Sequence, residues 1–333
     1  MFDHPHALLV IDATPFWRSL ALLPALRALR GAYPRTFLTA ATGKGTCEVL
    51  SVTGLADETI DLGVIDNQSG VGSAIKRFAQ IGRKAKGRQL DFALDFAPGP
   101  ETQLISRLVI GARTFSPSRL PHMLDRLLGR VGVVPPPGDH MDDCANVLGQ
   151  LGIKMADRRL GLVVPAEEND KFEKLLARNG SKGGEPLAVL HSSLAGDSHG
   201  WPVDRFGELA VSLASNLQAR IVAVDQPSDD KFTDQIGSLL PRGAIKIGSP
   251  RAYEMLAAVA RASLVITDEP GLAQAALDLG TPVLEIAERP SVNADRSHRV
   301  VFGASRARVP VEEVFTAACE IIQESRSSFL FQR

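Results

Sequence analysis

Short apolar runs alternate with amphipathic stretches along the whole sequence. In the first half, the pattern predicts strands at 7–12, 35–41, 59–63, 90–97 and 112–117. Apolar residues recur at helical spacing around 19–33, 44–53, 74–86, 101–110 and 139–150. Strands that are almost continuously apolar and interleaved with helices are typical of parallel sheets covered on both faces.

The same alternation begins again in the second half. Strands are predicted at 160–165, 187–193, 219–225, 244–249, 263–268 and 282–288. Helices are predicted at 166–179, 203–217, 228–240, 251–261, 271–279 and 310–325. Two series of about 150 residues each indicate two Rossmann-like domains of the α/β class. We expect domains at 1–155 and 156–310, followed by a C-terminal helix and tail at 311–333 that packs back across them.

This organisation directs attention to particular loops. In open α/β sheets, ligands bind beyond the carboxyl ends of the strands, against helix N-termini. Two such sheets facing one another would place a cleft between their strand-end loops. The loops in question are 13–18, 193–201, 225–230 and 267–273.

Composition narrows the class of protein. The chain has 333 residues, 44% apolar and 23% charged, with a formal net charge of −1, which predicts no general attraction to nucleic acid. Cys47, Cys144 and Cys319 form no CxxC pair, so neither a zinc site nor a disulfide framework is indicated. The start lacks a signal-peptide pattern and no run is long enough to span a bilayer. We expect a cytoplasmic protein that can contact a membrane surface.

The segment TDEPGLAQAALDLG follows a predicted strand and opens a helix. Gly271 at the helix start would let a ligand approach the backbone, and free amides with the helix dipole favour an anion such as a diphosphate. The alternative is a tight strand-to-helix turn that binds nothing.

Two further loops carry polar residues after strands. Ser192 and Ser193 could donate to phosphate oxygens, or they could form a simple turn while Trp201 packs in the core. Asp225 and Asp229 could accept hydrogen bonds from a ribose diol, although acidic residues at a helix start are commonly capping groups.

Three segments together resemble a known family. They are ALLVIDATPFWRSLALLPALRALRGAYP at 7–34, WPVDRFGELAVSL at 201–213 and EMLAAVARASLVITDEPGLAQAALDLGTPVL at 254–284. The chain is similar to glycosyltransferase family 9, which contains the ADP-heptose:lipopolysaccharide heptosyltransferases. This resemblance implies a GT-B fold, in which two Rossmann-like domains face an interdomain cleft and the C-terminal domain holds the donor.

The resemblance also implies a chemistry. The family transfers a sugar, with inversion and without metal or cofactor, from a nucleoside-diphosphate donor to a glycan or glycolipid acceptor of the cell envelope. An acceptor hydroxyl, helped by a general base, displaces the nucleoside diphosphate. Such acceptors belong to lipopolysaccharide biosynthesis and imply peripheral contact with the inner membrane. By position, the donor-binding residues would be Ser192, Ser193, His199, Asp225, Asp229, Glu269, Gly271 and Gln274.

The sequence departs from the family where the chemistry resides. Arg18 stands at the position of the catalytic aspartate, and arginine stays protonated at neutral pH. His199 replaces a phosphate-contacting lysine. In the Asp-Thr-Gly-x-x-His turn, Glu269 and Gln274 replace the first and last residues, and Gly271 is retained.

Several explanations of these departures stay open. In an active transferase, the catalytic candidates are Asp12 and Asp95, with His140 as a further candidate base, and Arg18 would stabilise the leaving diphosphate or an anionic acceptor. The alternatives are a catalytically degenerate GT-B protein that binds or scaffolds, and a nucleotide-sugar epimerase or hydrolase.

Other motifs carry less weight. The basic stretch KRFAQIGRKAKGR at 76–88 could meet an anionic membrane surface or could be a solvated helix face. HMDDC at 140–144 lacks the spacing of a zinc motif and is better explained as a helix start with acidic first-turn residues. No GxGxxG follows the first strand, which argues against a dinucleotide oxidoreductase.

Overall fold

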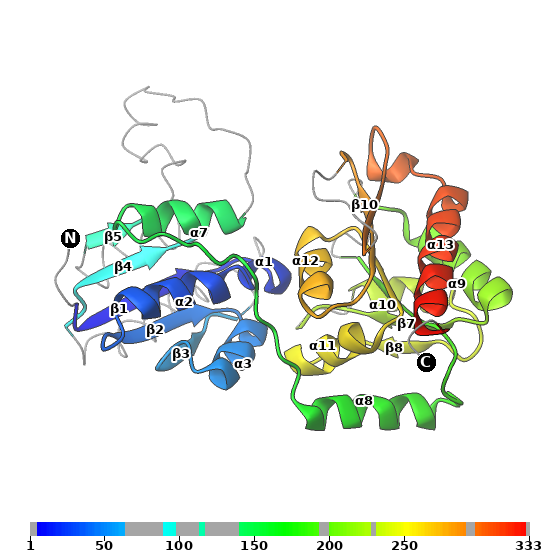
Figure 1. The fold of residues 1–333 in the computed structure, drawn as a ribbon, viewed down its shortest axis with the longest axis horizontal. Helices are drawn as coiled ribbons and strands as arrows, with labels where there is room; N and C mark the ends of the chain where they lie inside the picture. The colour runs from blue at the N-terminus through cyan, green and yellow to red at the C-terminus, as the bar shows by residue number, and fades with distance from the viewer. Residues whose placement is uncertain are drawn as a thin grey trace. The chain divides into compact units, whose positions relative to one another are not determined.

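The chain folds into two compact units, Met1–Gly161 and Leu162–Arg333, shown in Figure 1. The computed structural model describes residues 5–63, 89–97, 113–116, 140–192, 200–227, 231–290 and 297–330. Each unit has its own sheet, and every strand pairing in both sheets is parallel. The predicted α/β class with two parallel sheets is confirmed.

In the described part of the first unit, five strands form one sheet in the order β3-β2-β1-β4-β5. The strands are β1 (Ala7–Asp12), β2 (Phe37–Thr42), β3 (Glu58–Asp61), β4 (Phe92–Asp95) and β5 (Arg113–Phe115). The helices are α1 (Phe16–Ser19), α2 (Leu22–Ala32), α3 (Lys44–Thr53) and α7 (His140–Gly149).

The central strand β1 is buried along its whole length, as its uninterrupted apolar run predicts. The helix α2 turns Leu22, Leu26 and Leu29 into the core, where all three are fully buried. Along the chain α2 lies far from α7, but the two helices pack side by side. β1 therefore ends, at Asp12, inside the unit rather than at its surface.

The predicted strand at 160–165 is wrong, because this stretch belongs to no strand. Side chains bond part of its backbone instead. The guanidinium of Arg27 donates to the Leu160 carbonyl at 2.7 Å and to the preceding Arg159 carbonyl, and the Leu162 amide donates to Asp278 Oδ2 at 2.7 Å. Gly161 has a φ of +66°, and a Cβ at this position would lie 3.0 Å from Nη1 of Arg27. The apolar run is thus a connection that requires glycine.

In the described part of the second unit, six strands form one sheet in the order β11-β10-β9-β6-β7-β8. The strands are β6 (Leu187–His191), β7 (Arg220–Val224), β8 (Ile245–Ile247), β9 (Leu264–Thr267), β10 (Val283–Ala287) and β11 (His298–Phe302). The helices are α8 (Ala166–Arg178), α9 (Val203–Leu217), α10 (Lys231–Ile236), α11 (Ala252–Arg261), α12 (Pro270–Asp278) and α13 (Val311–Leu330), with a 3₁₀ turn η2 (Arg306–Arg308).

Helices cover both faces of this second sheet. On one face, α9, α10 and α13 share a buried cluster with alternate strand residues such as Ala188, Ile221 and Ile266. On the other face, α8 lies beside α11, and α12 packs on β9 and β10, as Figure 1 shows. Burial on both faces explains why the inner strands read as continuous apolar runs.

The edge strand β11 was not predicted from the sequence. Along HRVVF only His298 is buried, so the strand lacks the apolar run that marks the inner strands. Arg299 points to α13 instead, where it pairs with Glu320 and with Glu324, the latter at 2.8 Å. A half-exposed edge strand that carries charges cannot be told from a loop by its pattern alone.

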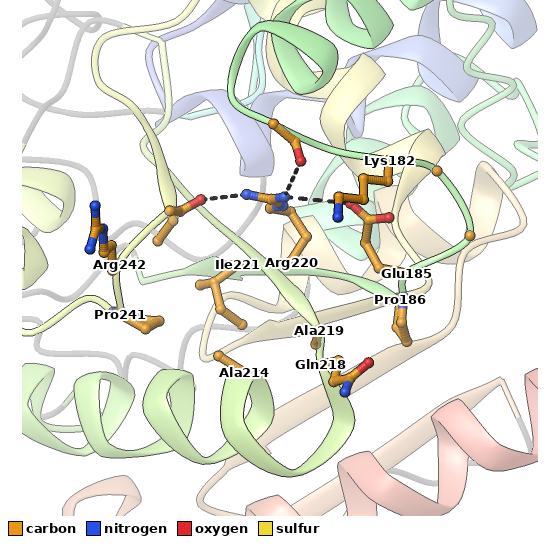
Figure 2. Close-up of a pocket in the computed structure, with 15 residues that line it drawn as sticks. Lys182, Glu185, Pro186, Ala214, Gln218, Ala219, Arg220, Ile221, Pro241 and Arg242 are labelled. Atoms are coloured by element: carbon orange, nitrogen blue, oxygen red, sulfur yellow. Dashed lines mark hydrogen bonds and ion pairs between the residues drawn. The ribbon is translucent and has the colours of Figure 1, made fainter.

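Arg220, the first residue of β7, donates hydrogen bonds to the backbone of two neighbouring loops (Figure 2). Its Nη1 donates to the Asn179 carbonyl at 3.1 Å and to the Gly243 carbonyl at 2.8 Å, and its Nη2 donates to the Gly180 carbonyl at 2.9 Å. The carboxylate of Glu185 lies 3.6 Å from Nη2. One guanidinium thereby joins the end of α8, the start of β7 and the turn before β8.

The same arginine lines a cavity of about 570 Å³ (Figure 2). The cavity also contacts Lys182, Glu185 and Arg242. It lies at the amino ends of β6, β7 and β8, which is the edge opposite to the ligand sites of open α/β sheets. A hydrogen bond from Ser181 lowers the pKa of Glu185, so this carboxylate already organises its own loop. We assign the cavity a structural role.

The helix α13 is 20 residues long and ends the described chain. Its first turn carries Glu312 and Glu313, and it packs against α9 and against β9, β10 and β11 of its own unit. Within the described ranges, no helix is both long enough and apolar enough to cross a membrane.

Replacing Arg220 by methionine should destabilise the protein by about 1–2 kcal/mol, because three backbone carbonyls lose the charged donor that they share. Urea unfolding measures the effect. The control is Arg242→Met, since Arg242 lines the same cavity but its exposed side chain makes no hydrogen bond to the described residues. Equal stability of the two variants would contradict the assigned role of Arg220.

Candidate functional site

In each sheet, successive strands are added first on one side of the first strand and then on its other side, so the strand order reverses beside the first strand. In the second unit β6 lies between β7 and β9, and in the first unit β1 lies between β2 and β4. Ligands of open α/β sheets bind beyond the carboxyl ends of the strands at this switch point. The residues that end or follow β6 and β9, and β1 and β4, are therefore the candidates.

Asp268, which follows β9, accepts hydrogen bonds from a residue directly after β6 and from a residue before α9. Its Oδ2 accepts a hydrogen bond from the Ser192 hydroxyl at 2.8 Å and another from the Trp201 amide at 3.2 Å. Trp201 itself is a core residue: its Nε1 donates to the Val309 carbonyl at 3.0 Å and its ring packs edge-on against Phe206. Trp201 therefore packs in the core, as the alternative interpretation of this loop expected.

The electrostatic state of Asp268 is unusual for a carboxylate. The residue is 1% exposed, and its Oδ1 has no hydrogen-bond partner among the described residues. Burial raises the pKa of Asp268, while hydrogen bonds from Ser192 and Trp201 and the charges of His191 and Arg306 oppose the rise. A buried acceptor without a partner, at a switch point, is a candidate contact for a ligand hydroxyl or N–H.

Asp225, predicted to bind a ribose, is engaged by the chain itself. Its Oδ1 accepts from the Phe232 amide at 3.0 Å, and its Oδ2 accepts from the amide and the hydroxyl of Thr233. Burial raises the pKa of Asp225, and the hydrogen bonds from Thr233 oppose this effect. The carboxylate caps the start of α10, which is the capping alternative considered above.

The start of α12 is occupied in a similar way. Glu269 Oε1 accepts from the Gly271 amide at 3.0 Å, Pro270 has no N–H, and the Ala273 amide bonds the Glu269 carbonyl at 3.1 Å. The amide that was predicted to face a diphosphate therefore faces the carboxylate of Glu269. A diphosphate bound here would have to displace that side chain.

Of the remaining residues predicted to bind the sugar donor, one lies in the described part of the chain and three lie outside it. Gln274 lies on α12 with an exposed side chain. Ser193, His199 and Asp229 lie outside the described residues, and so does the basic stretch 76–88.

A buried pair of side chains lies at the switch point of the first unit. His140 Nε2 lies 2.8 Å from Asp12 Oδ2, with side-chain exposures of 4% and 0%. The other carboxylate oxygen, Oδ1, accepts from the amide of Thr14 at 2.9 Å and from its hydroxyl at 2.7 Å. The end of β1 and the start of α7 are thus joined through the carboxylate of Asp12.

Of the predicted catalytic residues, the structure brings Asp12 and Asp95 to the same sheet edge. Asp95 pairs in register with Ile11, the residue before Asp12, and is 1% exposed. Its Oδ1 accepts from the Ala97 amide at 3.2 Å. Arg18 is exposed on α1 and does not contribute to this buried cluster.

The residues HMDDC begin a helix, as the sequence interpretation proposed. α7 starts at His140 and carries Asp142 and Asp143 in its first turn. Asp142 pairs with Arg158 at 2.7 Å. Within the described ranges, no three histidine, cysteine or acidic side chains are arranged to hold a metal ion.

Sequence reasoning missed three residues of the second unit. His191 ends β6 and its Nδ1 lies 2.8 Å from the Val224 carbonyl, while Asp268 follows β9. The available signal was a polar residue directly after an apolar strand. Arg306 has no such signal, because it reaches the sheet from η2, where its Nε donates to the Ile286 carbonyl at 3.2 Å.

Comparison with family models and with curated protein sequences gave no match. Solved structures do match over almost the whole chain. A family 9 glycosyl transferase of Veillonella parvula is 18% identical, with a TM-score of 0.73 over 97% of this chain and 99% of that one. The heptosyltransferase WaaC of E. coli, solved with ADP-2-deoxy-2-fluoro heptose, is 14% identical, with a TM-score of 0.61 over 96% and 99%.

The UDP-GlcNAc 2-epimerase of Neisseria meningitidis, solved with UDP-GlcNAc, is similar at a lower level. It is 12% identical, with a TM-score of 0.56 over 95% of this chain and 91% of that one. At these identities, the comparisons establish a shared fold. The chain has the fold of family 9 glycosyltransferases, and the predicted resemblance is confirmed at that level.

Replacing Asp268 by asparagine should raise the melting temperature at pH 7. Because burial raises the pKa of Asp268, its contribution to stability is present at low pH and is lost as the pH rises through the folded-state value. The difference between variant and wild type should therefore shrink as the pH falls towards 4. Calorimetry at both pH values measures it, with the exposed Asp204→Asn as control. A difference that grows at low pH would contradict this assignment.

Proposed function

We propose that the protein is a divergent family 9 glycosyltransferase that moves a sugar from a nucleoside-diphosphate donor to a cell-envelope glycan or glycolipid. The observation that carries this proposal is a buried polar cluster at the switch point of each sheet: Ser192 with Asp268 in one, and Asp12 with His140 in the other. We further propose inverting, metal-independent transfer in the cytoplasm, at the surface of the inner membrane, as part of lipopolysaccharide biosynthesis.

The donor would bind to the second unit. Its strand order, numbered along the unit, is that of Rossmann sheets that hold nucleotides at the switch point. Ser192 and Asp268 lie at this point, and their oxygens can accept hydrogen bonds from nucleoside hydroxyl and amino groups. The solved relatives with the same fold include proteins bound to ADP-linked and UDP-linked sugars.

The acceptor would bind to the first unit. Transfer requires a group that takes the proton of the attacking hydroxyl, and Arg18 cannot do so because it stays charged. The buried cluster at the end of β1 and β4 supplies Asp12, Asp95 and His140 as groups with the required chemistry.

A second candidate function is binding without catalysis. Two observations favour it. The carboxylate of Glu269 already accepts the hydrogen bond of the Gly271 amide at the start of α12, and the exposed Arg18 stands where the family resemblance places the catalytic aspartate. In that case the fold would serve as a scaffold or a sensor of a phosphorylated sugar carrier. Nucleotide binding with no turnover is the expected behaviour.

A nucleotide should stabilise the protein measurably. A ligand at 100 times its Kd stabilises a folded protein by about 2.7 kcal/mol, so 1 mM ADP or UDP should raise the melting temperature by several degrees. Gly271→Asp should abolish the increase, because it adds bulk and negative charge at the start of α12. No increase with ADP, UDP, ADP-glucose or UDP-GlcNAc would remove the proposed donor class.

Removing Glu269 should strengthen nucleotide binding. In Glu269→Ala the Gly271 amide is released and one negative charge is lost, so the Kd for ADP should fall by about 3- to 10-fold. The variant should also lose about 1 kcal/mol of stability with its helix cap. Titration calorimetry measures the affinity, with the exposed Glu208→Ala on α9 as control. Weaker binding would mean that Glu269 contacts the ligand itself.

Product analysis separates the enzymatic alternatives. With a donor and no acceptor, an epimerase would yield an isomerised nucleotide sugar, and a hydrolase would yield free sugar and nucleotide. A transferase should consume the donor faster when a glycolipid acceptor is added.

A further inference from the structure

The His140–Asp12 pair has the geometry of an oriented base. Asp12 ends the central strand β1, and His140 opens α7, 128 residues later in the chain. The hydrogen bond between Nε2 and Oδ2 is 2.8 Å long and buried. A fold that needed only to join β1 to α7 could do so with apolar side chains, without burying two ionisable groups.

Thr14 fixes the carboxylate in one orientation. Its amide and hydroxyl both donate to Oδ1, which leaves Oδ2 directed at the imidazole. An ionised carboxylate only accepts hydrogen bonds, so the proton of a neutral His140 resides on Nε2. The lone pair of the ring is then on Nδ1, the nitrogen that faces away from Asp12.

The other groups at this edge are less suited to accept a proton. Asp12 already accepts three hydrogen bonds, and one oxygen of Asp95 accepts the Ala97 amide. Arg18 is exposed and permanently charged. His140 remains as a side chain that combines a proton-accepting atom with an orienting partner, the arrangement by which a carboxylate stabilises the imidazolium formed during catalysis.

We propose that His140 is the general base of the transfer reaction and that Asp12 is its positioning residue. This inference rests on the proposed function. It assigns the general base to a position other than the one that the family resemblance gives it, because Arg18 occupies that position in this chain.

The step balances without a further reactant. Nδ1 of His140 takes the proton of the acceptor hydroxyl as its oxygen forms a bond to the anomeric carbon. The bond from that carbon to the diphosphate oxygen breaks, and its electron pair leaves with the nucleoside diphosphate. The imidazolium, stabilised by Asp12, then returns its proton to solvent.

The decisive variant is His140→Gln, compared with His140→Ala and Asp12→Asn. Glutamine can keep an N–H directed at Asp12 but cannot take up a proton. The matched control is His298→Gln, because His298 forms a similar pair with Glu285 at 2.8 Å in the other unit. The assay follows release of ADP or UDP from ADP-glucose and UDP-GlcNAc, with water and with a bacterial glycolipid extract as acceptors.

We expect turnover by His140→Gln and His140→Ala to fall about 10²- to 10⁴-fold. The Kd for ADP should stay within twofold and the fold should be retained, as judged by circular dichroism. Asp12→Asn should also slow turnover, because an amide can favour the wrong tautomer of His140. The limb of the pH–rate profile that rises with pH should disappear in His140→Gln. The charged groups on the elements that carry or adjoin the pair are Asp95 on β4 and Asp142 and Asp143 on α7, with Arg158 bonded to Asp142.

The outcomes separate this inference from the proposed function. Normal turnover by a folded His140→Gln, with an unchanged pH profile, would overturn the role of His140 and leave glycosyl transfer intact. A wild-type protein that binds nucleotide but forms no product from any of these pairs would overturn both. Loss of activity in His298→Gln to the same degree would also count against a specific role for His140.

Discussion

A buried carboxylate at the end of an apolar parallel strand must find hydrogen-bond donors, and much of this structure follows from that requirement. Asp12, Asp225 and Asp268 each follow or end an inner strand, and each is at most 2% exposed. Leaving such a group without partners in a low-dielectric interior would cost several kcal/mol. The loops and helices that follow the strands supply the donors, so the strand-end loops are shaped around these three side chains.

The same requirement sets what a ligand would meet. At α10 and α12, amides of the helix start already donate to the carboxylates of Asp225 and Glu269, which act as internal anions. An incoming phosphate would compete with a carboxylate that is covalently tethered, and so present at a high effective concentration. Asp268 differs, because one of its oxygens is buried without a partner among the described residues. At this switch point the chain offers acceptors more readily than donors, which favours contact with hydroxyl and amino groups of a nucleoside over contact with its phosphates.

The inner strands could be predicted from the sequence because burial on both faces leaves an uninterrupted apolar run. Strand prediction fails where an apolar run does not correspond to a strand buried on both faces. The run at 160–165 is apolar, yet it pairs with no strand and Arg27 bonds its first carbonyl, whereas β11 is a strand with only one buried residue. Among the site residues, Asp12 and Asp95 were found because they end apolar runs, but the partnership of Asp12 with His140 joins positions 128 residues apart. No local pattern encodes such a contact.

In the proposed transfer reaction, the two switch points would have different electrostatic requirements. A base is strengthened by neighbouring carboxylates, because they stabilise the positive charge that it acquires with the proton. A diphosphate is repelled by the same carboxylates. The first unit gathers Asp12 and Asp95 at one sheet edge with His140, whereas in the second unit His191 and Arg306 counteract the rise in the pKa of Asp268 that burial causes. In the proposed reaction, the carboxylates beside His140 would favour its uptake of a proton, whereas at the other switch point the acceptor oxygen of Asp268 would contact a nucleoside hydroxyl or amino group rather than a phosphate.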